Sequence, residues 1–370
     1  MTVYNVDHWG PPPARRHTGL PRCLQLTCLA LSAAVILAAC SSSKDNSTGA
    51  PDQPTLTVAT GSNGLNYAPF FVALAQNLFT KHGVKVKVQS ADAVATIQTL
   101  LVSNKIDLGM TSPSQITVLA AAGKPVNIVS NVDNYTGRSA GFVSSSKIKS
   151  FDQLKAMGTG CTITTTAPGT VLYAYAKKTM EVYGLKCKLR TVASNPLVLA
   201  AISAGLADAV PLTVNDAQAA TARGAHALLD PTTMSDAQAS SIVPVPLPAI
   251  VVAGLPATLK KKSTAVVSFL AALRDATNFI VSNTPETSAK LIVSQKYFAG
   301  LTVDQLTASI KALVSSFPTG ADLGQISQDT WSQTLTTFAS YFNLPSFDRS
   351  AQAVQYPTMI DMSYIGKLPK

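Results

Sequence analysis

Charged and chemically reactive side chains are scarce in this chain of 370 residues. Only 13% of the residues are charged, four are histidine, and no Cys/His group has the spacing of metal ligands. There is no G-x-x-x-x-G-K-[ST] loop and no complete dinucleotide-binding glycine pattern. The basic residues form no stripe interleaved with aromatic residues. The sequence therefore predicts no metal site, no bound cofactor and no nucleic-acid partner.

The apolar and small residues that are abundant indicate a folded protein. The chain is 46% hydrophobic and contains 21 glycines and 22 prolines, a composition that argues against long disordered segments. A chain of this length has room for two domains of ordinary size or for one large domain.

A targeting segment opens the chain. Three arginines precede an apolar run over residues 23–39, which ends in the tetrapeptide LAAC with Cys40. This run is at the low edge of membrane-spanning length. A basic start, a short apolar run and small residues at the end are typical of a secretory signal. We expect residues 1–39 to be a signal peptide and residues 40–54 a flexible tether.

Two cysteines, Cys161 and Cys187, remain beyond Cys40. Export to an oxidising compartment would permit a disulfide between them. We expect the two residues on neighbouring strands, where they are either bridged or two reduced core thiols, and the sequence leaves both alternatives open.

An internal repeat relates residues 60–130 to residues 161–231 at an offset of 101. Three anchor positions carry the same residue in both copies at this offset: Gly83 and Gly184, Asp107 and Asp208, and Gly123 and Gly224. Each copy alternates β-rich runs with amphipathic runs, which predicts parallel-type sheets with right-handed crossovers. We therefore expect an α/β protein of two lobes, each sheet flanked by helices, with a cleft between the lobes.

Hydrophobic periodicity sets the expected elements and boundaries. A three- and four-residue spacing of apolar side chains predicts a helix over 69–81, and another run predicts a helix over 264–283. We expect the helices after residue 264 to pack on lobe one. The expected ranges are 55–132 and 244–370 for lobe one, 138–238 for lobe two, and 133–137 and 239–243 for the hinge crossovers.

Ligands of open parallel sheets bind beyond the carboxyl ends of the strands. The loops expected there are rich in hydroxyl and amide groups and poor in Arg, Lys, Glu and His, which favours a small-molecule site over a catalytic one. Many of these residues are also ordinary helix caps, and Arg138 could pair an anionic ligand or lie on the surface. The candidate ligand-binding residues are Asn63, Asn66, Tyr67, Asp92, Thr111, Ser112, Tyr135, Arg138, Gly169, Thr170, Thr213 and Asn215.

One catalytic pattern competes with this interpretation. GRSAG, residues 137–141, matches the G-x-S-x-G nucleophile elbow and would make Ser139 the nucleophile of an envelope hydrolase. That elbow requires a helix after the serine, whereas the following FVSSSKIKS is β-like. We therefore expect a protein that is not an enzyme.

Several segments together resemble the substrate-binding proteins of ABC transporters, within the nitrate/sulfonate/taurine and pyrimidine-precursor group. They are the LAAC lipobox, NYAPFFVALAQNLFTKHGVKVKV, IQTLLVSNKIDLGMTSPSQ and ISAGLADAVPLTVNDAQ. The resemblance implies a type II periplasmic-binding-protein fold and a monomer that closes on a small polar or anionic organic molecule. It also implies lipid modification of Cys40, an extracytoplasmic location at the bacterial cell membrane, and delivery of the ligand to an ABC permease and its ATPase. The alternative within the same fold is an envelope sensing module without transport.

Departures from that group leave the ligand open. Asn66-Tyr67 stands where pyrimidine-precursor binders have Asn-His, so the role of the histidine is not carried over. Gly169-Thr170 stands where sulfonate binders often have Gly-Ser.

Overall fold

The computed structural model describes residues 53–369 apart from 62–63, 92–93 and 345–346. The description therefore concerns the unit Pro51–Lys370. The expected signal peptide, Cys40, and the candidates Asn63 and Asp92 lie outside the described residues.

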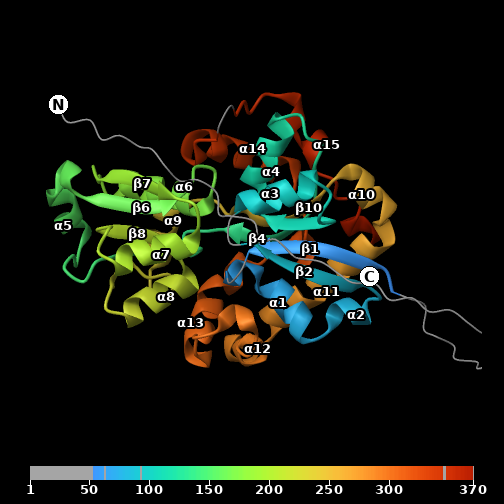
Figure 1. The fold of residues 1–370 in the computed structure, drawn as a ribbon, viewed down its shortest axis with the longest axis horizontal. Coiled ribbons are helices and arrows are strands. Elements are labelled where there is room, and N and C mark those ends of the chain that lie inside the picture. Colours follow the sequence, from blue (N-terminus) through green and yellow to red (C-terminus); the bar gives the residue numbers. More distant parts are fainter. Residues whose placement is uncertain (1–52, 62–63, 92–93, 345–346, 370) are drawn as a thin grey trace, which may run out of the picture. The chain divides into compact units, whose positions relative to one another are not determined.

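The first of two five-stranded sheets has the order β2-β1-β3-β10-β4 (Figure 1). β1 pairs in parallel with β2 and β3, whereas β10 runs antiparallel to β3 and β4. We call this sheet with its helices lobe one. Its strands are β1 (Thr55–Gly61), β2 (Lys85–Ala91), β3 (Leu108–Thr111), β4 (Asn127–Tyr135) and β10 (Leu247–Gly254).

The second sheet, with its helices called lobe two, repeats this plan in the order β7-β6-β8-β5-β9. β6 is parallel to β7 and β8, and β5 is antiparallel to β8 and β9. The α/β architecture predicted from the sequence is thus confirmed, but both sheets are mixed. The strands are β5 (Ala140–Ser144), β6 (Thr162–Thr166), β7 (Lys188–Val192), β8 (Ala209–Thr213) and β9 (His226–Leu229).

The antiparallel strand of each sheet is the one that enters from the other lobe. The chain passes from β4 to β5 through residues 136–139 and returns from α9 (Asp236–Ile242) to β10 through residues 243–246. These segments begin three and four residues after the starts of the expected crossovers, 133–137 and 239–243. Their role as hinges stays a prediction.

Helices cover both faces of the lobe-one sheet because successive strand residues point to opposite faces. Val58 joins one core with α1, α2 and α11, while Ala59 joins the other with α3, α4, α14 and α15 (Figure 1). The bounds are α1 (Ala68–Ala75), α2 (Leu78–Lys81), α3 (Val94–Val102), α4 (Pro113–Ala121), α10 (Pro256–Lys261), α11 (Ser263–Ser282), α12 (Pro285–Ile292), α13 (Val303–Leu313), α14 (Gln328–Thr337) and α15 (Tyr356–Met359).

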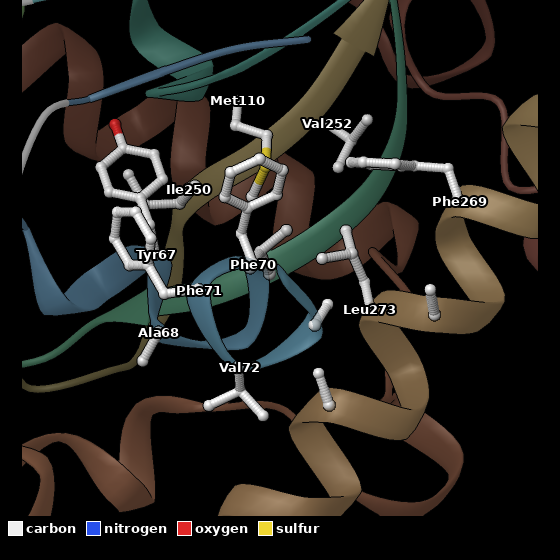
Figure 2. Packing of buried hydrophobic residues seen from close by; sticks show 14 of the residues in the cluster. Tyr67, Ala68, Phe70, Phe71, Val72, Met110, Ile250, Val252, Phe269 and Leu273 are labelled. Carbon is white, nitrogen blue, oxygen red and sulfur yellow. The ribbon is translucent and has the colours of Figure 1, made fainter. Parts of the chain in front are cut away.

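Aromatic packing holds α1 and α11 against the sheet. Figure 2 shows Phe70 and Phe269 beside Met110 and Val252, all of them buried. Phe79 stacks on Phe269 with ring centroids 5.0 Å apart, a geometry that adds to the stabilisation from burial. α11 is long and apolar enough to span a membrane, yet more than half of it is buried in this core, as in a core helix of a globular domain.

The helix predicted over 69–81 is interrupted. α1 ends at Ala75 and α2 begins at Leu78, because Asn77 adopts the left-handed conformation with φ of 55°. Asparagine tolerates this region better than most residues. The corresponding helix of lobe two, α6 (Val171–Val182), is continuous.

Lobe two has the same two-sided cover. α6 and α9 pack on one face, and α7 (Asn195–Ser203) and α8 (Val214–Ala222) pack on the other, while α5 (Phe151–Ala156) precedes β6. A disulfide joins Cys161 to Cys187 and links the starts of β6 and β7.

The sequence repeat has a structural counterpart, with one correction. α3 and α4 fall on α7 and α8 at an offset of 101. In the first strand the offset is 105. The equivalent residues there are Thr57 and Thr162, because the backbone N–H of Thr57 donates to Asp107 over 2.8 Å and that of Thr162 donates to Asp208 over 2.7 Å. Copy one therefore has four more residues than copy two between its first and second strands, and two of them come before its first helix.

The C-terminal helices contact both lobes. α11 and α12 contact α1, as expected for packing on lobe one. α13 also contacts α8, and the π-turn Phe338–Phe342 contacts α6. The backbone N–H of Gly169 donates to the carbonyl of Phe342 over 2.7 Å. This segment thus joins the two lobes beside the start of α6.

Candidate ligand-binding site

A cavity of about 200 Å³ lies where strand ends of both sheets meet. Lobe one contributes residues after β1, β2 and β3 and part of β10, and lobe two contributes residues after β6, β7 and β8. Among the described lining residues none is charged. The lining residues are Gly61, Gly64, Asn66, Tyr67, Ala91, Ile97, Ser112, Gln115, Ser139, Thr166, Ala167, Pro168, Thr170, Val171, Leu172, Ala193, Ser194, Asn195, Pro196, Thr213, Ala249 and Ile250.

Helix starts surround this cavity because each of these strands leads through a short loop into a helix. The N-cap positions of α1, α4, α6, α7 and α8 all line it: Tyr67, Ser112, Thr170, Ser194 and Thr213. Thr170 and Thr213 cap their own helices through their side chains. Ser112 and Ser194 do not, so their hydroxyl groups are not used for capping.

A buried carboxyl group stands behind the wall formed by the loop after β1. Nδ2 of Asn66 donates to Oδ2 of Asp133 over 2.7 Å, and the Ser316 hydroxyl contacts Oδ1 of the same carboxyl group. Asp133 is fully buried, and this desolvation raises its pKa to about 7 although these contacts and the Asn134 backbone lower it. Sequence analysis missed this residue because nothing local marks a contact between positions 66 and 133.

Tyr67 fits beside the first strand because position 61 is glycine. A Cβ atom at Gly61 would lie 2.7 Å from the ring of Tyr67. Burial raises the pKa of Tyr67 further above its usual value, so the phenol stays neutral, and its oxygen accepts the backbone N–H of Gly61. In Figure 2 the hydroxyl points away from Phe70 and Phe71.

Hydrogen bonds connect the two lobes at one edge of the cavity. The Ser114 hydroxyl donates to the carbonyl of Gly169 over 2.5 Å, and Nε2 of Gln115 donates to the same oxygen over 2.9 Å. Gly169 has φ of +86°, and a Cβ there would lie 2.7 Å from Gln115. Glycine is therefore required both by the backbone conformation and by the close approach of the lobes.

The structure brings five of the sequence-derived candidates together. Asn66, Tyr67, Ser112, Thr170 and Thr213 line the cavity. Thr111 and Asn215 are buried directly beside the lining residues Ser112 and Thr213, without lining the cavity themselves. Gly169 lies at the contact between the lobes.

The remaining two described candidates lie elsewhere. Arg138 donates to the carbonyls of Pro231 and Met234 and pairs with Asp236 at 2.7 Å. Tyr135 lines a second, mostly apolar cavity of about 420 Å³ between α6, the segment before β10 and α14. The smaller cavity is the candidate ligand-binding site, because strand ends and polar groups of both sheets converge there.

Other lining residues were not predicted. Gln115, Ser139, Thr166, Ser194 and Asn195 all line the cavity. The repeat contained a signal for Ser194, because the offset of 101 carries the candidate Asp92 onto Ala193, the residue directly before Ser194. Gln115 carried no such signal, since it lies in the first turn of a helix.

The geometry around Ser139 does not form a nucleophile elbow. Ser139 is followed by β5 rather than by a helix, and its hydroxyl contacts the backbone of Asn134 and Thr136. His226, a histidine that follows Ser139 in the chain and could have served as its base, contacts the carbonyl of Lys149. Within the described part of the chain there is no group of three or more His, Cys, Asp or Glu side chains that could hold a metal ion.

A protein-family model described as "NMT1/THI5 like" matches residues 65–288. No curated protein sequence matches the chain. Solved structures share its fold, and their identities to it are low enough that the likeness concerns the fold alone.

Three of these structures illustrate the likeness. The ligand-binding component of an ABC-type import system from Staphylococcus aureus is 12% identical, with 86% of this chain and 99% of that chain covered and a TM-score of 0.67. The alkanesulfonate-binding protein SsuA from Xanthomonas axonopodis pv. citri is 16% identical, with 84% and 100% covered and a TM-score of 0.64. The nitrate-binding protein NrtA from Synechocystis PCC 6803 is 14% identical, with 85% and 88% covered and a TM-score of 0.62.

Proposed function

Because the chain belongs to the NMT1/THI5-like family, we propose that it is an extracytoplasmic solute-binding protein of an ABC importer. It binds a small organic molecule in the cavity of about 200 Å³ and delivers it to a membrane permease driven by an ATPase. Residues 1–39 are the signal peptide, and a lipid on Cys40 anchors the protein through the tether 40–54. Binding proteins of import systems with the same fold support this proposal.

The proposal rests on one observation: both lobes contribute residues to the cavity wall. Neutral polar groups at strand ends of both lobes face one space, and the lobes contact each other beside it through Ser114, Gln115 and Gly169. A ligand in this space touches both lobes, so it binds the closed arrangement more tightly than an open one. By that differential affinity it shifts the population towards closure.

Lobe one, comprising 55–132 and 244–370, and lobe two, comprising 138–238, then move about the two crossovers. Asn66, Tyr67, Ser112 and Thr213 contact the ligand, and Thr170 fixes the start of α6. The lining offers no charged group to act as acid or base among the described residues. The function is therefore binding rather than catalysis.

A thermal-shift screen of residues 51–370 tests the proposal. A ligand that binds only the native state raises the melting temperature in proportion to the logarithm of its concentration. The screen covers sulfonates, nitrate, aromatic acids, polyamines and pyrimidines. At least one of these classes is expected to raise the melting temperature, and no shift with any class would contradict a solute-binding function.

A further inference from the structure

Several hydroxyl and amide groups that line the cavity donate their hydrogen bonds to other groups of the protein and not to the cavity. The carbonyl of Gly169 can only accept, so the Ser114 hydroxyl donates to it over 2.5 Å. Oγ of Ser112 lies 2.6 Å from Oγ of Ser114, whose proton is already used. Ser112 must therefore donate to Ser114, and what Ser112 offers to the cavity is oxygen lone pairs.

Lobe two repeats this arrangement with threonines. The Thr170 hydroxyl donates to the carbonyl of Ala167 over 2.8 Å and accepts the backbone N–H of Tyr173. Oγ1 of Thr166 lies 2.5 Å from Oγ1 of Thr170 and must donate to it. Thr170 is then fully occupied, and Thr166 has only lone pairs left for a ligand.

Two further hydroxyl groups at the cavity have committed protons. Thr213 donates to Oδ2 of Asp216 over 2.8 Å. Ser139 donates to the carbonyl of Asn134 over 3.3 Å and accepts the backbone N–H of Thr136 over 2.9 Å. Thr213 leaves an oxygen lone pair unassigned, whereas the Ser139 oxygen also lies 3.4 Å from the Thr136 hydroxyl.

Two of the three amides that line the cavity, Asn66 and Gln115, are oriented in the same sense. Nδ2 of Asn66 is turned to Asp133, and Nε2 of Gln115 to the carbonyl of Gly169, so Oδ1 and Oε1 are the ends turned away from these partners. The orientation of Asn66 holds in both protonation states of Asp133. A protonated Oδ1 can donate to Ser316, which itself donates to the carbonyl of Leu313, and Oδ2 remains an acceptor.

Backbone donors are also reduced. Pro69, Pro113 and Pro196 occupy the first or second position of α1, α4 and α7 and remove N–H groups from three helix starts. The remaining side-chain donors are the Tyr67 hydroxyl and the half-exposed Ser194 and Asn195. Neither Ser194 nor Asn195 has a side-chain hydrogen bond to a described residue.

From this arrangement, and resting on the proposed solute-binding function, we propose that the cavity selects a small organic molecule that donates N–H hydrogen bonds. The molecule is neutral or cationic and has an apolar body that contacts Ile97, Leu172 and Ile250. Helix dipoles favour an anion at longer range. An oxyanion in contact with the wall, however, would meet lone pairs and leave its own acceptors unsatisfied, which is costly in a desolvated site.

Three ring compounds of nearly the same shape test this preference: benzamidine, benzamide and benzoate. Methanesulfonate and nitrate represent the oxyanions. We expect benzamidine and benzamide to raise the melting temperature of residues 51–370 in a concentration-dependent way, and the three anions to leave it unchanged. Shifts with the anions alone would overturn the preference for donors and leave solute binding standing. No shift with any probe would contradict both proposals.

Variants test the hydrogen-bond directions that lead to this preference. In the double variant Asp133→Asn with Ser316→Ala, the new amide has no Ser316 oxygen to donate to, so it donates to Oδ1 of Asn66 and turns the Asn66 amide group towards the cavity. We expect the ratio of benzamidine to benzoate affinity to fall about tenfold, the effect of one hydrogen bond. Ser316→Ala removes the other contact of Asp133 and should leave the ratio unchanged.

A second variant acts through Ser112, at another strand end of lobe one, and covers the case in which the double variant does not fold. Ser114→Ala removes the acceptor of the Ser112 proton, so Ser112 can donate to a ligand. The affinity ratio should again fall. An unchanged ratio in the folded double variant or in a folded Ser114→Ala protein would overturn the proposal.

Discussion

The two copies of the repeat share one arrangement of strands and helices, but they differ in the length of one segment and in one covalent link. Both use an aspartate, Asp107 or Asp208, to accept a backbone N–H of the first strand. Copy one has four more residues between its first two strands, two of them before its first helix, in the loop that carries Asn66 and Tyr67 to the cavity. The duplication thus explains the position of the site, and the inserted residues make its two walls unequal.

A second difference lies between the first two strands of each copy. With the offsets of 105 and 101, Cys161 and Cys187 correspond to Leu56 and Val86, which are register partners on β1 and β2. Copy two therefore has a covalent link where copy one has an apolar pair. The two lobes use different means to fix the same strand pairing.

The largest change in stability is expected from Asp133, the fully buried carboxyl group behind the copy-one loop. Its folded pKa of about 7 exceeds the unfolded value of about 3.8, so the native state binds more protons between these pH values. Stability from this group is therefore full below about pH 4 and is lost as pH rises towards 7, at up to about 1.4 kcal/mol per pH unit.

Urea unfolding of the wild type and of Asp133→Asn from pH 4 to pH 7 measures this contribution. The stability of the wild type relative to the variant should fall as pH rises. A difference that stays constant over this range would show that Asp133 does not titrate there.

Removal of the disulfide is the next largest change. Cys161 and Cys187 are 26 residues apart, and closing a loop of that length restricts the unfolded chain by about 3–4 kcal/mol in the chain-entropy model. Cys161→Ser with Cys187→Ser should lower the free energy of unfolding by that amount. A reductant should destabilise the wild type and leave the double variant unaffected, and equal sensitivity of both proteins would contradict this account.

Asp107 and Asp208 occupy equivalent positions in the two copies, so the stability losses of their variants can be compared directly. We expect these losses to be smaller than that from removing the disulfide. Asp208→Ala removes one charge-assisted hydrogen bond and should cost about 2 kcal/mol. Asp107 also pairs with Lys262 at 2.8 Å, but this lysine is one-third exposed, so Asp107→Ala should cost at most about 1 kcal/mol more.

Denaturant unfolding of each variant, with and without Lys262→Ala, measures the two costs. The excess at Asp107 should vanish in the Lys262→Ala background. A larger loss of unfolding free energy for Asp208→Ala than for Asp107→Ala would contradict the proposal that the two aspartates play equivalent roles.

The sequence predicted the elements whose signals are local. Apolar periodicity and the anchors Gly83, Asp107 and Gly123 were enough for the two-lobed α/β plan. The interruption at Asn77 was missed, because a single left-handed residue does not disturb the apolar spacing. The antiparallel strands β5 and β10 were also missed as such, because their direction depends on the crossing of the chain between lobes.

The site could be predicted only as a set of loops. Strand ends and small polar residues pointed to Asn66, Ser112 and Thr213. The contact of Asn66 with Asp133 spans 67 positions and has no local pattern. Thr170 was expected to bind ligand, but its hydrogen-bonding capacity is used within its own loop and helix.

Isothermal titration of the strongest ligand from the screen against the wild type, Asn66→Ala and Asn283→Ala tests whether the ligand occupies the cavity between the lobes. Asn283 is exposed, and its side chain bonds only within its own helix among the described residues. The account predicts measurable binding by the wild type, a loss of about tenfold in affinity for Asn66→Ala, from one lost hydrogen bond, and no change for Asn283→Ala. Equal affinity in all three proteins would show that the ligand does not occupy the cavity between the lobes.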